Sequence, residues 1–175
     1  MIKPVVSAVA RSGITPNQLT LIGFGISLLS AYAFFSLQQA IGGILLLVSG
    51  LFDILDGGVA KISGRVTKFG GVLDSTLDRY SDAIVIGAII VARLSDPISG
   101  VAALTGSVLV SYIRARGEIE GVKMSGVGIM ERAERIVVLA VTALVGYVWV
   151  GVLVLAVLTQ VTAIQRLYHL RKALK

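Results

Sequence analysis

Aspartates are the residues whose spacing in this sequence most clearly suggests chemistry. Asp53 and Asp56 stand three residues apart, and Asp74 and Asp78 stand four apart, each pair within a long apolar stretch. At about 100° per helical residue, the first pair spans about 60° and the second about 40°, so each pair lies on one helix face. An ionised side chain inside a membrane costs roughly 2.5–3.5 kcal/mol. With Asp82, five aspartates fall within predicted spans, so their presence needs a shared explanation.

The connection at 62–69 predicts that the two pairs converge. Counted inward from it, Asp56 and Asp74 come first, and Asp53 and Asp78 follow about one helical turn later. An antiparallel hairpin would gather four carboxylates near one membrane surface. Their repulsion at low dielectric is relieved by protonation or by a bound cation. Hard oxygen ligands favour Mg²⁺, Mn²⁺ or Ca²⁺, and Mg²⁺ is commonly completed by substrate phosphate.

Glycines beside the carboxylates leave room for a bulky anion; they stand at positions 57, 58, 70 and 71. Together with the carboxylates they predict a metal–diphosphate site. Two other interpretations stay open. The aspartates could form ion pairs with Arg79, Lys61 or Arg65 while the glycines only allow close helix packing, or they could line a path for protons or ions.

The composition predicts the elements that position these residues. Of 175 residues, 55% are hydrophobic, 15% are charged and none is cysteine, with a mean hydropathy of +0.90. These values exclude an ordinary soluble domain, a disordered chain, a disulfide scaffold and a Cys-ligated metal site. A crossing helix needs about 20 apolar residues. We therefore expect an all-α polytopic membrane protein, with one domain over residues 1–175.

Long apolar runs predict six transmembrane helices after a short interfacial helix. Their expected ranges are 16–38, 41–62, 69–93, 97–118, 131–147 and 149–172. Thr15-Pro16 and Asp96-Pro97 mark two helix starts, because each places a capping side chain before a proline at the first helical position.

The distribution of basic residues predicts the orientation. With six spans, every Lys and Arg except Arg79 and Arg93 falls on the side that holds both termini. The positive-inside rule assigns that side to the cytoplasm. We expect a multi-pass protein of the cell membrane whose site faces the cytoplasm. Its basic C-terminus fits an anchor to anionic lipid rather than a nucleic-acid surface.

A second polar cluster lies at the cytoplasmic ends of the fourth and fifth predicted spans. Arg132 and Arg135 are three residues apart and share one helix face. If that face looks toward the aspartates, together with Arg114 and Arg166, the pocket suits an alcohol that itself carries phosphate. The alternative is that these arginines follow the positive-inside rule and pair with neighbouring glutamates.

Asp82 extends the stripe of Asp74 and Asp78 by one turn. An ion pair with Arg79, three residues earlier, and a functional role are both open for this residue.

The segment from Asp53 to Asp78 resembles the motif of the CDP-alcohol phosphotransferases, DGxxAR with flanking acids followed by GxxxDxxxD. It reads Asp53-Ile-Leu-Asp56-Gly57-Gly-Val-Ala60-Lys61, then Gly70-Gly-Val-Leu-Asp74-Ser-Thr-Leu-Asp78. The departure is Lys61, because the family usually has Arg there; Lys keeps the charge but not the planar fork. The six-span layout and the segment 14–20 are also similar to this family.

The resemblance implies an enzyme that transfers the phosphatidyl-type group of a CDP-lipid to an alcohol and releases CMP. By similarity, two divalent ions, Mg²⁺ or Mn²⁺, would be held by Asp53, Asp56, Asp74 and Asp78. Asp78 would also act as the base that accepts the proton of the alcohol. The CDP-lipid would contact Gly57, Ala60, Lys61, Gly70 and Asp74.

The basic cluster is most similar to the branch of the family that uses inositol phosphate, in its archaeal form. By that similarity, the phosphate of inositol 1-phosphate would be held by Arg114, Arg132, Arg166 and Arg135. Glycerol 3-phosphate is the alternative acceptor, and an ion-coupled transporter is the alternative outside this class. The resemblance also implies a homodimer. Whether the donor carries an archaeol ether or a diacylglycerol ester stays open.

Overall fold

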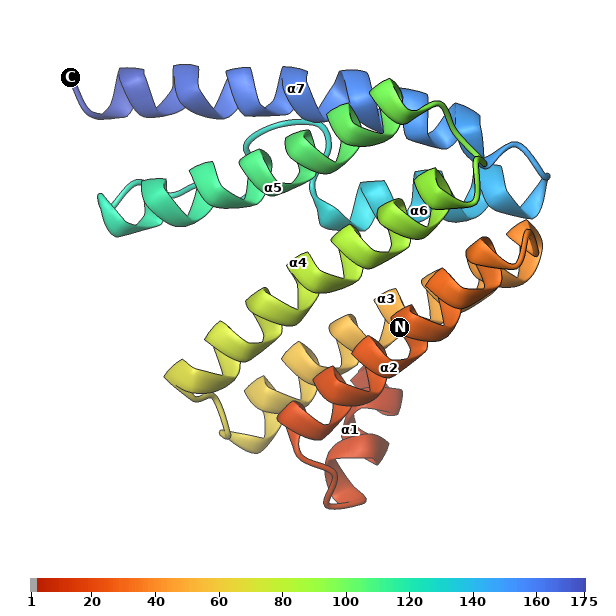
Figure 1. Cartoon of the computed structure of the whole chain (residues 1–175). Helices are drawn as coiled ribbons and strands as arrows, with labels where there is room; N and C mark the ends of the chain where they lie inside the picture. The colour runs from red at the N-terminus through yellow and green to blue at the C-terminus, as the bar shows by residue number, and fades with distance from the viewer. Residues whose placement is uncertain (1–2) are drawn as a thin grey trace.

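The computed structural model describes residues 3–175, which form seven α-helices and no strand (Figure 1). The helices are α1 (Lys3–Arg11), α2 (Pro16–Phe35), α3 (Gln39–Ser63), α4 (Lys68–Val91), α5 (Pro97–Ile119), α6 (Arg132–Leu144) and α7 (Val148–Ala173). The all-α prediction is confirmed. Each predicted span corresponds to one helix, and the predicted ends differ from the observed ends by three residues at most.

Four helices, α2, α3, α5 and α7, are long and apolar enough to cross a membrane. The chain is therefore a multi-pass membrane protein. α4 does not qualify because Asp74, Asp78, Arg79 and Asp82 interrupt its apolar sequence. α6 has only 13 residues, which rise about 20 Å, against a hydrocarbon thickness of about 30 Å. Crossing by all six helices stays a prediction.

Side-chain caps determine where three helices begin. Thr15 Oγ1 accepts a hydrogen bond from the backbone N–H of Gln18 at 3.3 Å, and Gln18 Oε1 accepts one from the Thr15 N–H at 2.8 Å. Asp96 Oδ1 accepts from the Ser99 N–H at 2.8 Å, so both predicted starts are confirmed. At α4, Thr67 Oγ1 accepts from the Gly70 N–H at 2.9 Å. These caps occupy donors that a helix N-terminus otherwise leaves unpaired.

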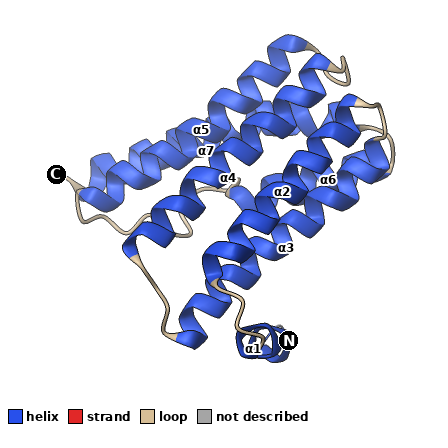
Figure 2. Ribbon diagram, turned by 60° about the horizontal axis from the view of Figure 1, so that its bottom comes forward, coloured by secondary structure: helices blue, strands red, loops and turns tan. Residues whose placement is uncertain are grey.

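The long helices form two groups, which are joined by α6 and by the packing of α4 against α5. α2 packs along both α3 and α4, and α5 packs along α7, while α6 contacts α3 on one side and α7 on the other. Figure 1 shows α5 and α7 side by side, with α2, α3 and α4 in the other half of the molecule. In Figure 2, α1 is seen nearly end-on beside the long helices, so it lies at a steep angle to them. That position fits the predicted interfacial helix.

The largest apolar core lies in the half of the bundle beyond Asp53, Asp56, Asp74 and Asp78, and its residues Leu46, Ile86 and Leu139 surround Asp82. It joins the C-terminal parts of α2, α4 and α6 to the first turns of α7 through Phe34, Ile89, Leu139, Val148 and Leu155, among others. The opposite half has smaller apolar clusters, one of which packs α1 against α3. The well-packed half thus holds the helices at one end, and the polar residues lie where the helices diverge.

Candidate active site

The four predicted carboxylates are brought to one region, and α2 holds the two helices that carry them. α2 packs against α3 and against α4, whereas α3 and α4 barely touch each other directly. Asp53 and Asp56 come from the C-terminal half of α3, and Asp74 and Asp78 from the N-terminal half of α4. Three cavities open between the helices around these residues.

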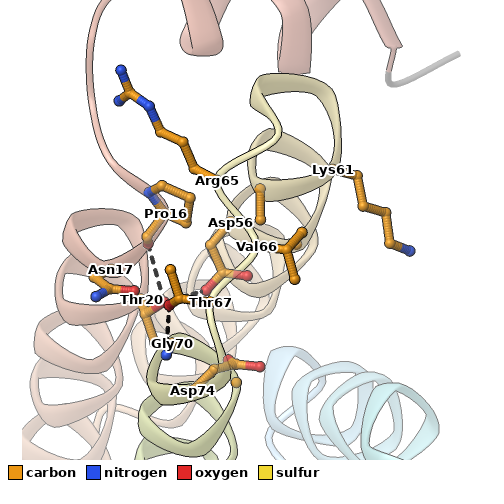
Figure 3. Close-up of a pocket in the computed structure, with 13 residues that line it drawn as sticks. Pro16, Asn17, Thr20, Asp56, Lys61, Arg65, Val66, Thr67, Gly70 and Asp74 are labelled. Atoms are coloured by element: carbon orange, nitrogen blue, oxygen red, sulfur yellow. Dashed lines mark hydrogen bonds between the residues drawn. The ribbon is translucent and has the colours of Figure 1, made fainter.

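The first cavity, of about 180 Å³, lies between α2, α3 and α4. All five residues predicted to contact the CDP-lipid line it, namely Gly57, Ala60, Lys61, Gly70 and Asp74. In Figure 3 the carboxylates of Asp56 and Asp74 face this space, while the charged ends of Lys61 and Arg65 extend away from it. The cavity therefore has two carboxylates on its inner wall.

Asp56 is the buried carboxylate of this first cavity, with 4% of the residue exposed. Its Oδ2 accepts a hydrogen bond from Thr20 Oγ1 at 2.7 Å, drawn as a dashed line in Figure 3. Gly70 closes another wall, because a Cβ there would lie 2.8 Å from Thr67 Oγ1 and 3.0 Å from Asn17 Oδ1. Only glycine fits between these oxygens.

The second cavity, of about 380 Å³, lies between α4, α5, α6 and α7. Asp74 and Asp78 line one side of it, and Arg114, Arg132 and Arg166 line the other. Three of the four arginines predicted to bind the acceptor phosphate thus share one cavity with two of the carboxylates predicted to hold metal, one of which, Asp78, is also the predicted base.

Arg166 is held firmly in the second cavity. Its guanidinium donates to the carbonyl oxygens of Val110 at 2.6 Å and Val127 at 2.9 Å, and to Glu131 Oε1 at 2.9 Å. Arg114 is more exposed and donates to Glu118 at 3.0 Å. Two of the arginines therefore do pair with glutamates, yet both still face the cavity.

The third cavity is a groove of about 460 Å³ along α3 and α6. Its walls are apolar over most of their length, with Leu47, Leu51, Ile54, Ile136 and Val137. At one end it reaches four polar residues, Asp53, Asp74, Asp78 and Arg132. The groove thus joins an apolar surface to the carboxylate cluster.

Arg132 lies at the centre of the carboxylates. Its Nη1 donates to Asp53 Oδ2 and lies 2.9 Å from Asp78 Oδ1, and its Nε lies 3.6 Å from Asp82 Oδ1. Arg79 lies 3.9 Å from Asp78 and forms no ion pair with Asp82 among the described residues. The chain therefore supplies its own cation to the deeper carboxylates.

Arg135 was predicted to bind the acceptor phosphate with the other three arginines, but the structure places it outside their cavity. Its side chain is 3% exposed, and its Nη2 donates to Asp82 Oδ2 at 2.7 Å. Arg135 follows Arg132 by one turn on α6, so it lies deeper in the bundle, behind Arg132 as seen from the cavity.

Residues 3–175 contain no three His, Cys, Asp or Glu side chains arranged to hold a metal ion as they stand. Arg132 is bonded to two of the predicted carboxylates, Asp53 and Asp78. The donor set nevertheless suits a hard divalent cation, because it consists of carboxylate oxygens. Asp56 fits best, since it is buried and has a hydroxyl partner but no ion pair among the described residues.

Several cavity residues were not assigned a role from the sequence. Asn17, Thr20 and Thr67 line the first cavity, and Ser75, Arg79 and Ser111 line the second. Thr20 could have been predicted, because it is a polar residue one turn after Pro16 in an apolar run. Ser111 could not, because its position near α4 arises only from the packing of α4 against α5.

The fold and the site together match a known class of enzymes. Residues 13–169 match the CDP-alcohol phosphatidyltransferase family, and the chain belongs to that family. Its curated relatives include the archaetidylinositol phosphate synthase of Pyrococcus horikoshii, 45% identical over 166 residues, covering 95% of this chain and 88% of the relative. The enzyme of that name from Methanothermobacter thermautotrophicus is 40% identical over 171 residues, covering 94% and 87%.

Solved structures agree with this assignment. The phosphatidylinositol phosphate synthase of Mycobacterium tuberculosis with CDP-DAG bound matches with a TM-score of 0.84 and 31% identity, over 97% of this chain and 93% of that one. Its complex with manganese and citrate matches with a TM-score of 0.85 and 31% identity, over 98% and 89%. The suspected family is confirmed.

Proposed function

We propose that this enzyme transfers the lipid phosphate group of a CDP-lipid to inositol 1-phosphate and releases CMP. Family membership supports the reaction class. The relatives named archaetidylinositol phosphate synthase support the acceptor and an archaetidyl donor.

The observation that carries this proposal is the position of Asp74. It is the one residue in the walls of all three cavities described above. One cavity contains the carboxylates of Asp56 and Asp74, one contains arginines that face carboxylates, and one is an apolar groove. A reaction that joins a nucleotide, a phosphorylated alcohol and a lipid needs such a meeting point.

The donor would occupy two of these cavities. Its cytidine diphosphate would lie in the first cavity, where Gly57 leaves open space and Lys61 forms part of the wall. Its apolar tails would lie along the groove between α3 and α6. Leu51, Ile54 and Val137 on that groove are each about half exposed, which suits contact with lipid chains.

Asp53, Asp56, Asp74 and Asp78 are the residues that would hold two divalent ions, Mg²⁺ or Mn²⁺. When bound, such ions neutralise a diphosphate and stabilise a leaving phosphate oxygen. Asp56, buried without an ion pair, would gain most from a cation. Asp53 and Asp78 would share their charge between the ions and Arg132. The relative solved with manganese supports this assignment.

The acceptor would enter the second cavity with its phosphate held by Arg114, Arg132 and Arg166. Arg132 contacts Asp78 at 2.9 Å, so a phosphate on Arg132 places the rest of the acceptor beside that carboxylate. Asp78 would take the proton of the attacking hydroxyl. The hydroxyl oxygen forms a bond to the lipid-linked phosphorus, and the bond from that phosphorus to the CMP oxygen breaks.

We further propose that the site and both termini face the cytoplasm, and that the protein is a homodimer in the membrane. The orientation rests on the basic residues around the site and at the chain ends. A cytoplasmic site allows CMP and inositol 1-phosphate to exchange with water while the lipid stays in the bilayer.

Measurement of CMP release tests the proposal. Purified protein in detergent would receive a CDP-lipid, Mn²⁺ or Mg²⁺, and either inositol 1-phosphate or glycerol 3-phosphate. We expect release with inositol 1-phosphate. Release only with glycerol 3-phosphate would keep the reaction class and change the acceptor. No release with either, combined with ion flux in proteoliposomes, would favour a transporter instead.

A further inference from the structure

Asp82 is the one carboxylate in the α4 stripe that the proposed function leaves without a role. It lies one turn beyond Asp78 and does not line any of the three cavities described above. Both of its oxygens face arginines of α6, with Oδ1 3.6 Å from Arg132 Nε and Oδ2 2.7 Å from Arg135 Nη2. Asp82 is therefore already neutralised by the chain.

Asp82 and Arg135 form a buried pair behind the site. Their side chains are 14% and 3% exposed, and Asp82 is the only ion-pair partner of Arg135 among the described residues. The surrounding wall is apolar, with Leu46, Ile86 and Leu139. Each charge in such a place depends on the other, because an unpaired charge in an apolar site is strongly unfavourable.

Arg132 links this pair to the second cavity. Its Nη1 faces Asp53 and Asp78, while its Nε faces Asp82. Nη1 is bonded to Asp53 and Asp78, whereas the buried Nε has no hydrogen-bond partner and is attracted to Asp82 by charge alone at 3.6 Å. That attraction favours one orientation of the group, whose Nη atoms form the edge that can bind a phosphate. Without Asp82, only the contacts to Asp53 and Asp78 would orient Arg132.

We propose that Asp82 is a positioning residue for the acceptor: paired with Arg135, it holds Arg132 of α6 in the orientation that binds the acceptor phosphate. This inference rests on the proposed function of the second cavity. It assigns Arg135 a supporting role in place of the direct phosphate contact expected from the sequence. It also separates Asp82 from the four carboxylates proposed to hold metal.

The test uses the double variant Asp82→Asn/Arg135→Gln. It replaces both buried charges with amides at once, so neither residue is left as an unpaired ion, although glutamine is shorter than arginine. The single variant Asp82→Asn leaves Arg135 unpaired and is the more disruptive change. The double variant therefore keeps the proposal testable if the single variant fails to fold.

We expect the double variant to raise the KM for inositol 1-phosphate about tenfold or more, because a ground-state phosphate contact is weakened. The KM for the CDP-lipid should stay within about twofold, since none of the first-cavity residues is altered. Titration with inorganic phosphate, followed calorimetrically in Mn²⁺, should show a similar loss of affinity. An unchanged acceptor KM and phosphate affinity, or equal losses for donor and acceptor, would overturn the proposal.

Arg116→Gln/Glu120→Gln is the matched control. These residues form an exposed ion pair at 2.6 Å on α5, outside the residues that line the second cavity. The control should change neither KM. Wild-type protein that turns over no alcohol phosphate would reject the proposed function. The phosphate titration would still test the role of Asp82. If wild type and double variant bind phosphate equally, or if neither binds it, the proposed role of Asp82 is wrong.

Discussion

Five aspartates of α3 and α4 fall into two sets with opposite electrostatic surroundings. Asp56 and Asp74, nearest the connection between the helices, have no ion pair among residues 3–175. Asp53, Asp78 and Asp82, one or two turns deeper, share Arg132 and Arg135. The same residue type on the same two helices is thus compensated in one place and left open in the other.

The difference indicates where ligands are to bind. A buried carboxylate without a partner costs free energy, so the open set suits an external cation and the charged groups that come with it. In the compensated set, Arg132 and Arg135 supply the positive charge that neutralises the carboxylates, and the ion pairs also orient the side chains. Asp78 belongs to the compensated set yet lines two cavities, which suits a group that handles a proton next to a bound phosphate.

The largest expected effect comes from replacing Asp78, the carboxylate of the compensated set that lines two cavities. Asp78→Asn should lower turnover by at least about 100-fold, because a general base contributes roughly 10²–10⁴-fold. Binding of the CDP-lipid should remain measurable, since the open set is intact. CMP release and CDP-lipid binding, measured side by side, check this. Turnover at the wild-type rate would contradict the role of Asp78.

The second largest effect is expected on the free energy of unfolding of the metal-free protein, which should differ between variants of the two sets. Asp82→Asn leaves Arg135 buried without its carboxylate and should destabilise the protein by roughly 3 kcal/mol. Asp56→Asn removes a buried charge that has no ion pair, so metal-free stability should not fall. Thermal unfolding in detergent with chelator present measures both variants. If Asp56→Asn were the more destabilising of the two, the division into an open and a compensated set would be wrong.

Replacement of Arg132, which the compensated set shares, should mainly change the KM for the acceptor. Arg132→Gln should raise the acceptor KM about tenfold or more, because it removes a charge-assisted contact to phosphate. The KM for the CDP-lipid should change much less. Steady-state CMP release with varied inositol 1-phosphate measures the effect, with Arg116→Gln as control. An unchanged acceptor KM would place the phosphate pocket elsewhere.

The smallest effect is expected from an aspartate at the opposite end of the bundle. Asp96 caps α5, and hydrogen bonds from the side chain and backbone of Ser99 lower its pKa below the ordinary value of 3.8. A lowered pKa means that the cap stabilises the fold above that ordinary value and is lost as pH falls through the lowered one. Asp96→Ala should cause a slight drop in apparent Tm near neutral pH, and no drop in acid. A change in either KM would contradict its purely local role.

Local signals were enough to predict the helices and their ends. Thr15 and Asp96 cap the helices that they were expected to start, and the apolar runs correspond to observed helices. These features depend on residues close in sequence, so no knowledge of the packing was required. The length of α6 was overestimated because the turn around Gly146 ends it earlier than hydropathy suggests.

The family resemblance, rather than spacing alone, assigned residues 57, 60, 61, 70 and 74 to the CDP-lipid. The structure places all five around one cavity, and their contact with the CDP-lipid stays a prediction. Arg132 and Arg135 were expected to share a helix face, and both contact Asp82. The sequence did not predict that Arg132 would line a cavity while Arg135 is buried. Helical periodicity indicates which face a residue occupies, but not how deeply the neighbouring helices bury it.

By itself the sequence determined an all-α membrane protein with carboxylates on two neighbouring helices and a basic cluster further along the chain. Helical period, capping and hydropathy act over a few residues, so they can be read in one dimension. Tertiary structure alone decided that α2 would hold α3 and α4 apart around the cavities. It also decided that Arg132 would compensate Asp53 and Asp78 while Asp56 stayed open. Charge compensation depends on distances between side chains from different helices, and those distances exist only once the helices have packed.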